Sequence, residues 1–174
     1  MGIEVSEKDL DTIRKNIEND KLELQIGSAT NLRFDENSFD TIVSWEVIEH
    51  IPRGHEKAML TEVSRVLKPG GVFYLSTPHR SLFANILDPA WWFGHRHYTK
   101  EQLKRYAQGT RLEIESVKIK GGWWSLFFIL NMYVSKWILV RKPIMENFFS
   151  GKEHVEYMKD EGFANLFIKF RKSQ

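Results

Sequence analysis

Short apolar segments alternate along the chain with segments in which apolar residues recur every three or four positions. Thr41-Ile42-Val43 is β-branched and apolar, which is typical of a strand buried on both faces of a parallel sheet. Further strands are predicted at 22–26, 72–77, 112–119 and 164–171. The alternation of such strands with helices predicts an α/β fold with a mainly parallel sheet and helices on both of its faces.

Capping residues and helix breakers locate the helices. Ser6 followed by Asp9, and Thr99 followed by Gln102, have the spacing of capping boxes and predict a helix after each cap. A further helix between them is expected to end at 68–71, where a lysine precedes proline and two glycines. Residues 78–98 contain two prolines and a glycine and are expected to form a loop at a strand end, where functional sites are often built.

An acidic, histidine-bearing segment follows the strand at 41–43. Glu46, Glu49 and His50 have i, i+3, i+4 spacing, so a helix beginning near Glu46 would place their side chains on one face. Open α/β sheets bind ligands beyond such strand ends, and we expect the catalytic residues here. His50 is the candidate general base, with Glu46 beside it. The other interpretation of His50 is a hydrogen bond to a neighbouring loop.

Composition narrows the class of protein. The 174 residues fit one domain, and 42% hydrophobic and 28% charged content is ordinary for a globular protein. The net charge of +2 does not support nucleic-acid binding, and no nucleic-acid partner is expected. Cysteine is absent, which excludes disulfides and thiolate metal sites and is compatible with a reducing cytosol. The polar first residues do not resemble a signal peptide, so a cytoplasmic location is expected.

Five segments in a fixed order resemble the class I S-adenosylmethionine-dependent methyltransferases of the "type 11" group. They are Gly2-Ile3-Glu4-Val5-Ser6, Gly27-Ser28-Ala29-Thr30-Asn31-Leu32, Asn37-Ser38-Phe39-Asp40, Glu46-Val47-Ile48-Glu49-His50 and Leu67-Lys68-Pro69-Gly70-Gly71. The resemblance implies a Rossmann-like seven-stranded sheet whose last strand is antiparallel, with 164–171 as that strand. Residues 1–174 would then form one methyltransferase domain, partial at its start.

The resemblance also implies cofactor-binding positions for S-adenosylmethionine. Glu4, followed by Val5, matches the acidic residue that accepts hydrogen bonds from the ribose hydroxyls. Ser28-Ala29 matches the adenine-binding segment, with Ser28 where the family has an aspartate. Ser44 and Trp45 match residues that flank the methionine end of the cofactor.

The family's first strand and its Gly-x-Gly-x-Gly turn would precede Gly2 and are expected upstream, in a longer methyltransferase. That strand is central in the family's sheet, so two apolar edges would lack a neighbour without it. Two alternatives to an upstream strand are that the sheet has closed over the gap and that a strand from another chain fills it. Poor cofactor affinity, or none, is expected for residues 1–174 alone.

A metal is a further possibility at Glu46, Glu49 and His50, because carboxylates and imidazole on successive helical turns can share a divalent ion. A subgroup of the family, the quinone-precursor O-methyltransferases, resembles this chain in using a Glu-x-x-Glu-His segment for magnesium. The same segment is widespread in relatives that need no metal, so no metal ligand is assigned.

The loop at 78–98 is the expected acceptor-side lid. Its basic and aromatic side chains suit an anionic or polyhydroxylated acceptor, and the candidate substrate-binding residues are His79, Arg80, His95, His97 and Tyr98. The alternative is a loop whose aromatic residues simply cover the core.

A hydrophobic insertion occupies 121–162, and 123–140 within it is apolar almost all round. Polar residues interrupt it and strands of one sheet flank it, which excludes a membrane span. Two interpretations remain: peripheral contact with a membrane surface, or a packed lid or homo-oligomer contact. The predicted function is methyl transfer to oxygen of a small or lipid- or glycan-linked acceptor; the alternative is a non-catalytic remnant acting as a membrane-associated or oligomerising module.

Overall fold

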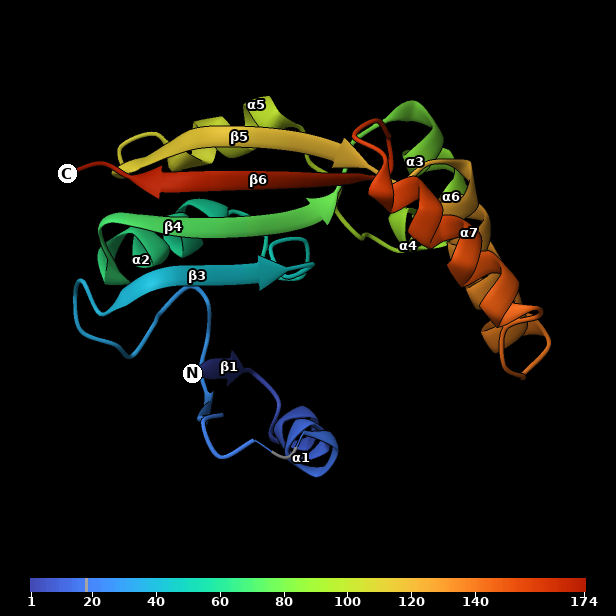
Figure 1. The fold of residues 1–174 in the computed structure, drawn as a ribbon, viewed down its shortest axis with the longest axis horizontal. Coiled ribbons are helices and arrows are strands. Elements are labelled where there is room, and N and C mark those ends of the chain that lie inside the picture. Colours follow the sequence, from blue (N-terminus) through green and yellow to red (C-terminus); the bar gives the residue numbers. More distant parts are fainter. Residues whose placement is uncertain (18) are drawn as a thin grey trace.

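The computed structural model describes residues 1–17 and 19–174 and contains an α/β sheet with the strand order β3-β4-β6-β5 (Figure 1). Strand β3 (Phe39–Trp45) pairs in parallel with β4 (Leu67–Pro78). Strand β6 (Asn165–Lys172) is antiparallel to β4 and to β5 (Leu112–Lys120). The predicted α/β class and the antiparallel last strand are therefore confirmed.

The N-terminal strands form a second, separate sheet. Strand β1 (Gly2–Glu4) pairs in parallel with β2 (Leu24–Ile26), and α1 (Glu7–Asn16) lies beside them. Within the described residues β1 and β3 share no ladder, and Figure 1 shows the two strands apart. The sheet has thus not closed around the position where the family's first strand is expected.

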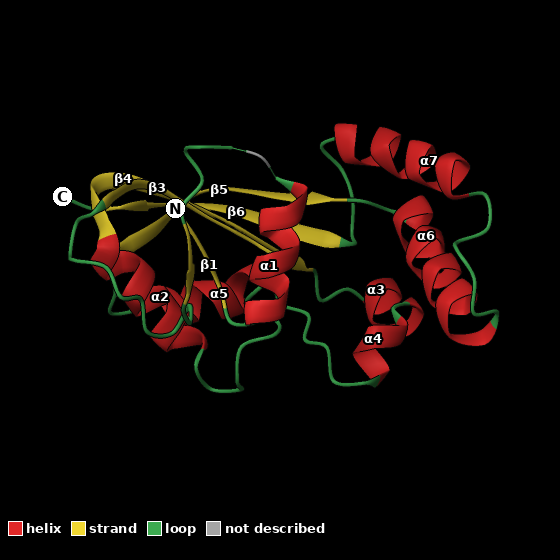
Figure 2. Cartoon of the chain, turned by 90° about the horizontal axis from the view of Figure 1, so that it is seen from below, coloured by secondary structure: helices red, strands yellow, loops and turns green. Residues whose placement is uncertain are grey.

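The core lies between the main sheet and two helices, α2 (Glu56–Val66) and α5 (Lys100–Ala107), which lie on one side of the sheet (Figure 2). Phe73 and Phe170 stack across β4 and β6 with their ring centroids 5.8 Å apart, and both are fully buried. The opposite side of the sheet is less covered: Val43 is 51% exposed. The prediction that the strand at 41–43 is buried on both faces is therefore wrong, because helices cover only one face of β3.

Strand β4 begins earlier than the breakers at 68–71 suggested. Leu67 already pairs with Phe39, and the register shifts before Thr41 pairs with Val72. Gly71 fits here because a Cβ would lie 2.8 Å from the Lys68 carbonyl oxygen and 3.0 Å from that of Asp40. The glycines therefore form a bulge in a strand and do not end the preceding helix.

Residues 78–98 are only partly a loop. They contain two short helices, α3 (Leu82–Leu87) and α4 (Pro89–Trp92), each preceded by a residue that caps it. Ser81 Oγ accepts a hydrogen bond from Ala84 N, and Asp88 Oδ1 accepts one from Ala90 N. Some of the residues that predicted a loop begin helices instead: Ser81 and Asp88 are N-caps, and Pro89 is the first residue of α4.

The hydrophobic insertion forms a helical hairpin beyond the end of the sheet (Figures 1 and 2). It consists of α6 (Trp123–Tyr133), a π-helical turn η1 (Val134–Ile138) and α7 (Glu146–Met158). Glu156 on α7 caps α6 by accepting hydrogen bonds from the amides of Gly122, Trp124 and Ser125. Among the described residues, each helix is too short or too polar to cross a membrane.

Candidate active site

The segment from Glu46 to His50 leaves the carboxyl end of β3 as a turn, not as the predicted helix. Glu46 has a positive φ of 52°, and its amide donates to the carbonyl and to the hydroxyl oxygen of Ser76, each at 3.2 Å. The helical prediction failed because these bonds keep the Glu46 amide paired with β4 and because Glu46 has a left-handed φ, so a right-handed helix does not begin there. A non-glycine residue in the left-handed region is strained, and such strain is frequent at functional sites.

Two hydroxyl groups at the end of β4 bind the two glutamates of the turn. Ser76 Oγ donates to Glu46 Oε1 at 2.6 Å, and Thr77 Oγ1 donates to Glu49 Oε2 at 2.9 Å. Glu49 is only 3% exposed, and its second oxygen, Oε1, is buried without a hydrogen-bond partner. Burial, and next the negative charge of Glu46, raise the pKa of Glu49 to about 7, and burial also raises the pKa of Glu46.

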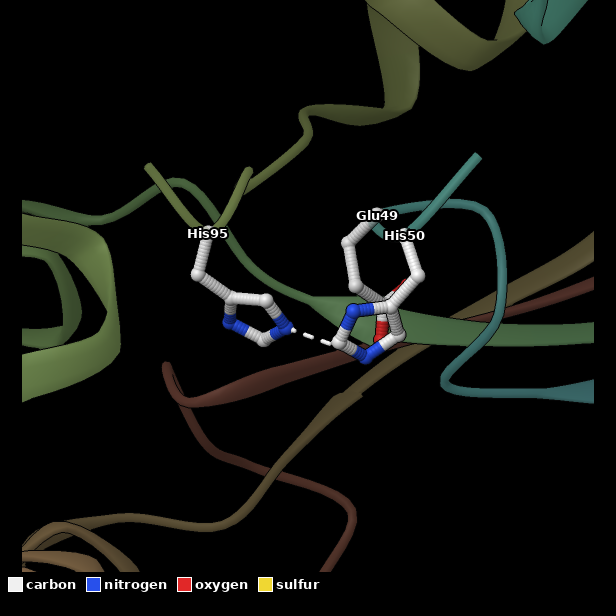
Figure 3. A group of neighbouring side chains, drawn as sticks. All are labelled: Glu49, His50 and His95. Atoms are coloured by element: carbon white, nitrogen blue, oxygen red, sulfur yellow. Dashed lines mark hydrogen bonds between the residues drawn. The ribbon is translucent and has the colours of Figure 1, made fainter. Parts of the chain in front are cut away.

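His50 lies beside His95, a residue of the segment that follows α4. The two Nε2 atoms lie 3.4 Å apart, and the ring centroids lie 4.8 Å apart (Figure 3). Burial, then the charges of His95 and Arg96, lower the pKa of His50 below its ordinary value. The Asp88 carboxylate, 3.7 Å from His95 Nδ1, raises the pKa of His95. His50 is therefore the imidazole better suited to accept a proton at neutral pH.

His97 is buried and has partners on both ring nitrogens. Its Nε2 lies 3.0 Å from Asp88 Oδ2, and its Nδ1 lies 2.9 Å from Asn85 Oδ1. Burial alone would raise the pKa of Asp88, but the neighbouring His95 ring and hydrogen bonds with His97 and the Ala90 amide hold it well below its usual range. His97 and Asp88 therefore form a buried pair that fixes the segment after α4.

Arg96 ties the turn to α2. Its guanidinium donates to the carbonyl oxygens of Ile48, Glu49 and Ile51, and it forms an ion pair with Glu56 at 2.5 Å. These bonds hold the backbone on either side of His50. Arg96 is therefore a positioning residue for the candidate base.

The remaining predicted acceptor-side residues lie elsewhere. Tyr98 is 3% exposed, and its hydroxyl donates to Glu56 Oε1 at 3.1 Å, beneath the turn. His79 Nδ1 lies 3.2 Å from the carbonyl oxygen of Phe163, and Arg80 is exposed. The structure thus brings His95 to His50 and places Tyr98, His79 and Arg80 outside the cavities described next.

Two cavities meet at His95. The larger, of about 490 Å³, is lined by the polar residues Glu49, His50 and His95 and by the aromatic residues Phe93, Tyr133 and Trp137. The smaller, of about 170 Å³, is lined by Glu46, Asp88 and His97 and by residues of α6. The lining therefore combines imidazoles and carboxylates with aromatic side chains from the hairpin and from the residue after α4.

A third cavity, of about 390 Å³, lies between β1 and β3. Ala29, Ser44 and Trp45 line it, together with Ile3 and Val43. Ser44 Oγ is buried without a hydrogen-bond partner, whereas Glu4, Val5 and Ser28 are not among the lining residues. Glu4 Oε1 accepts from Val5 N at 2.7 Å, and Ser28 Oγ lies 2.9 Å from Thr30 Oγ1. Of the predicted cofactor residues, Ala29, Ser44 and Trp45 therefore line this cavity. Glu4, Val5 and Ser28 lie in or next to the strands of the N-terminal sheet.

Sequence reasoning missed four residues that shape the site: Ser76, Thr77, Asp88 and Arg96. Ser76 and Thr77 end the strand next to β3, and adjacency of strand ends is the signal that could have paired them with Glu46 and Glu49. Arg96 acts through contacts with segments more than forty residues away, and Asp88 acts through His97, nine residues further along the chain.

The fold and the site together define a Rossmann-like ligand-binding domain, with polar residues beyond the carboxyl ends of parallel strands. Residues 1–75 match the family described as a methyltransferase domain. The structure of geranyl diphosphate methyltransferase in complex with S-adenosylmethionine has the same fold, with a TM-score of 0.62 at 12% identity over 98% of this chain and 67% of that one. The resemblance to the class I S-adenosylmethionine-dependent methyltransferases is thus confirmed over residues 1–75, and the solved structure shows the fold alone.

Two curated relatives match part of the chain. A probable S-adenosylmethionine-dependent methyltransferase from Mycolicibacterium smegmatis is 31% identical over 96 residues, which cover 55% of this chain and 37% of that protein. A ubiquinone biosynthesis O-methyltransferase from Actinobacillus pleuropneumoniae is 31% identical over 93 residues, covering 49% of this chain and 39% of that protein. The matched segments therefore span about two fifths of the length of these relatives.

Proposed function

We propose that the chain serves methyl transfer from S-adenosylmethionine to an oxygen atom of a small or lipid- or glycan-linked acceptor. The observation that carries this proposal is the meeting of Glu46, Glu49 and His50 with His95 at the carboxyl end of β3. The relatives named as S-adenosylmethionine-dependent and as an O-methyltransferase support it.

The cofactor would occupy the side of β3 that faces the N-terminal sheet. Ser44 and Trp45 end β3 at the 390 Å³ cavity, and the unpartnered Ser44 hydroxyl is available to a polar group of the methionine end. Glu4 carries a carboxylate that can accept from both ribose hydroxyls, with Val5 beside it and Ser28-Ala29 toward the adenine. Approach of β1 to β3 would bring these groups together.

His50 is the proposed general base. Its pKa is lowered, so the neutral imidazole is present at pH 7, and its side chain is exposed to the 490 Å³ cavity. An acceptor hydroxyl within hydrogen-bonding distance of His50 would lose its proton to the imidazole while its oxygen attacks the methyl carbon of the sulfonium. The cofactor, when bound, would supply the methyl group and take up the electron pair of the broken carbon–sulfur bond. Glu46, beside Ser44 and Trp45, would position the reacting groups.

The acceptor-side cavity suits a molecule with a polar end and an apolar body. His50, His95 and Arg53 line one part, whereas Phe93 and Trp137 line the other, with their ring centroids 5.4 Å apart. An oxygen-bearing ring or sugar would lie at the imidazoles, and an attached apolar chain would leave over the aromatic pair. This arrangement favours a lipid-linked acceptor over a wholly polar one.

The tip of the hairpin supports contact with a membrane surface. Ile138 is 72% exposed and Val140 is 84% exposed, and the exposed cations Lys136, Arg141 and Lys142 flank them. Exposed apolar side chains bordered by cations are typical of segments that lie in the interface of an anionic bilayer. The tip adjoins Trp137, so a docked tip would place the aromatic side of the cavity close to lipid.

A non-catalytic, membrane-associated or oligomerising module is the second candidate. The observation that favours it is that β1 and β3 lie in separate sheets, with an apolar cavity between them. A strand from a second copy that paired with β3 would fill this cavity and produce a homo-oligomer. The cofactor side of β3 would then be closed.

Transfer of radiolabelled methyl from S-adenosylmethionine separates the two candidates. The purified chain, and the chain extended by the residues encoded upstream of Met1, would be incubated with phenolic quinone precursors bearing short or long isoprenoid chains. Label that enters the organic phase, and increases with acceptor chain length, supports the proposal. Absence of label with both forms of the protein contradicts it.

A further inference from the structure

We propose that Glu49, His50 and His95 form a binding site for a divalent transition-metal ion of the zinc type. Each offers one ligand atom, and these three atoms lie within 4.8 Å of one another (Figure 3). The two Nε2 atoms are 3.4 Å apart. Two imidazoles bound to one tetrahedral zinc ion at about 2.05 Å have nitrogens about 3.3 Å apart. The histidine pair therefore already has the spacing of a metal-bound pair.

Glu49 is the proposed ligand that a neighbouring group orients. His95 Nδ1 is buried without a hydrogen-bond partner, and Asp88 Oδ2 lies 3.7 Å from it, too far for a hydrogen bond in this structure. Thr77 holds Glu49 Oε2, which leaves Oε1 free, and Glu49 Oε1 is buried without a partner. A buried carboxylate oxygen without a hydrogen bond is costly, and a cation would compensate it.

The donor set selects the class of metal. Two imidazole nitrogens and one carboxylate suit zinc and other first-row transition ions, whereas magnesium prefers oxygen ligands. Among residues 1–17 and 19–174, Glu46 is not part of a group with metal-ligand spacing, and its Oε1 accepts from Ser76. The magnesium set of Glu46, Glu49 and His50 is therefore not formed, and His95 takes the place of Glu46.

A second group, Asp88, His95 and His97, is less suitable. His97 already has a partner on each ring nitrogen, and Asp88 bonds it directly. Glu49, His50 and His95, in contrast, line the 490 Å³ cavity, which has room for a fourth ligand such as water or an acceptor oxygen. The site is defined by its ligands and does not depend on the proposed methyl transfer. With the ion bound, His50 Nε2 is occupied and is not a free base.

Cobalt titration tests the proposal directly. The protein, without a histidine tag and stripped with a chelator, would be titrated with Co²⁺ while its visible absorption is recorded, and Zn²⁺ would then be added. We expect absorption bands of cobalt in a four- or five-coordinate site, saturation at one ion per chain, and displacement by Zn²⁺. The proposal is overturned if the absorption does not saturate, or if it saturates at several ions per chain, as binding to scattered surface groups would.

Matched variants locate the site. His50→Ala and Glu49→Gln should each weaken Co²⁺ binding by more than the roughly 10–100-fold typical of losing an outer-shell partner. His154→Ala replaces an exposed histidine on α7, and should bind as the parent does. Because His50 is exposed, its replacement should leave the circular dichroism spectrum unchanged, which separates ligand loss from misfolding. Unchanged affinity in both His50→Ala and His95→Ala contradicts the assignment. Cobalt binding without methyl transfer would refute only the proposed function.

Discussion

His50 Nε2 lies 3.4 Å from His95 Nε2, although the two residues come from different segments, one after β3 and the other after α4. The contact joins β3, the proposed cofactor side, to the segment after α4, the proposed acceptor side. It depends on Arg96, which binds the backbone of the turn, and Asp88 Oδ2 lies 3.7 Å from His95 Nδ1. The chemistry proposed here therefore rests on contacts between segments, not on one motif.

Replacement of His50 by Gln should lower kcat for methyl transfer by about a hundredfold or more, because general-base catalysis typically contributes a factor of this size. The pKa of His50 is lowered, so the parent should remain active at neutral pH and lose activity as pH falls through that lowered pKa. The variant should lack this acid limb. Steady-state kinetics between pH 5 and 9 checks both results, with His154→Gln as the matched control. An unchanged pH profile in His50→Gln would exclude His50 as the base.

The Glu49 carboxyl should make stability depend on pH. Its pKa is 4.5 in the unfolded chain and about 7 in the fold, so the fold holds a proton that the unfolded chain releases between these values. Stability should therefore fall as pH rises from about 4.5 to 7. Glu49→Gln should weaken this dependence, leaving the part due to Glu46, whose pKa is also raised. The variant should be more stable than the parent by about 3 kcal/mol at pH 8, with little difference at pH 4. Urea unfolding with a chelator present measures the free energy of unfolding at each pH. If this free energy changes equally with pH in the parent and in the variant, the pKa of Glu49 is not raised.

Loss of Arg96 should destabilise the fold strongly. Its side chain is 14% exposed and that of Glu56 is 5% exposed, so Arg96→Met leaves a buried carboxylate without its cation. It also removes the side-chain donor of the Glu49 and Ile51 carbonyl oxygens, whereas Glu56 keeps only the Tyr98 hydroxyl. We expect a loss of about 3 kcal/mol, typical of breaking a buried ion pair. Arg80→Met, at an exposed position, should change stability by less than about 0.5 kcal/mol. Chemical denaturation of both variants measures their free energies of unfolding. Equal losses in the two variants would show that the Arg96 side chain does not hold the turn.

Contact with anionic membranes should depend on the hairpin tip. Ile138→Ser should weaken co-sedimentation with vesicles that contain anionic lipid. The double variant Arg141→Gln, Lys142→Gln should lower the affinity for these vesicles by about thirtyfold, because each cation near the surface contributes about 1 kcal/mol. Ile26→Ser, at an exposed apolar position on β2, should sediment as the parent does. Unchanged sedimentation in both tip variants would favour the hairpin as a lid or oligomer contact.

Local signals in the sequence predicted the helix caps and most of the strand positions well. Ser6 caps α1 by accepting from Asp9 N, and Thr99 and Gln102 form the predicted capping box of α5. Met59 and Leu60, with Val63 four and three positions further on, form the buried face of α2. These features depend on residues three or four positions apart, so the sequence pattern contains them.

Features that depend on distant residues were not predictable. The spacing of Glu46, Glu49 and His50 indicated a helix, but Ser76 bonds the Glu46 amide and turns the chain instead. Tyr98 was expected at the acceptor because it lies in the basic and aromatic segment 78–98, yet its hydroxyl bonds Glu56 and its ring is buried in the core. In each case a partner more than twenty residues away decides the side chain's role, and no local pattern reports it.

The most direct test of the central claim is calorimetric titration with S-adenosylhomocysteine. It would be done on residues 1–174 and on the chain extended by the residues encoded upstream. Our account predicts weak binding or none by residues 1–174, one-to-one binding by the extended chain, and weaker binding when Glu4 in that chain becomes Ala. Absence of binding by both forms, or binding that Glu4→Ala leaves unchanged, would contradict the cofactor assignment.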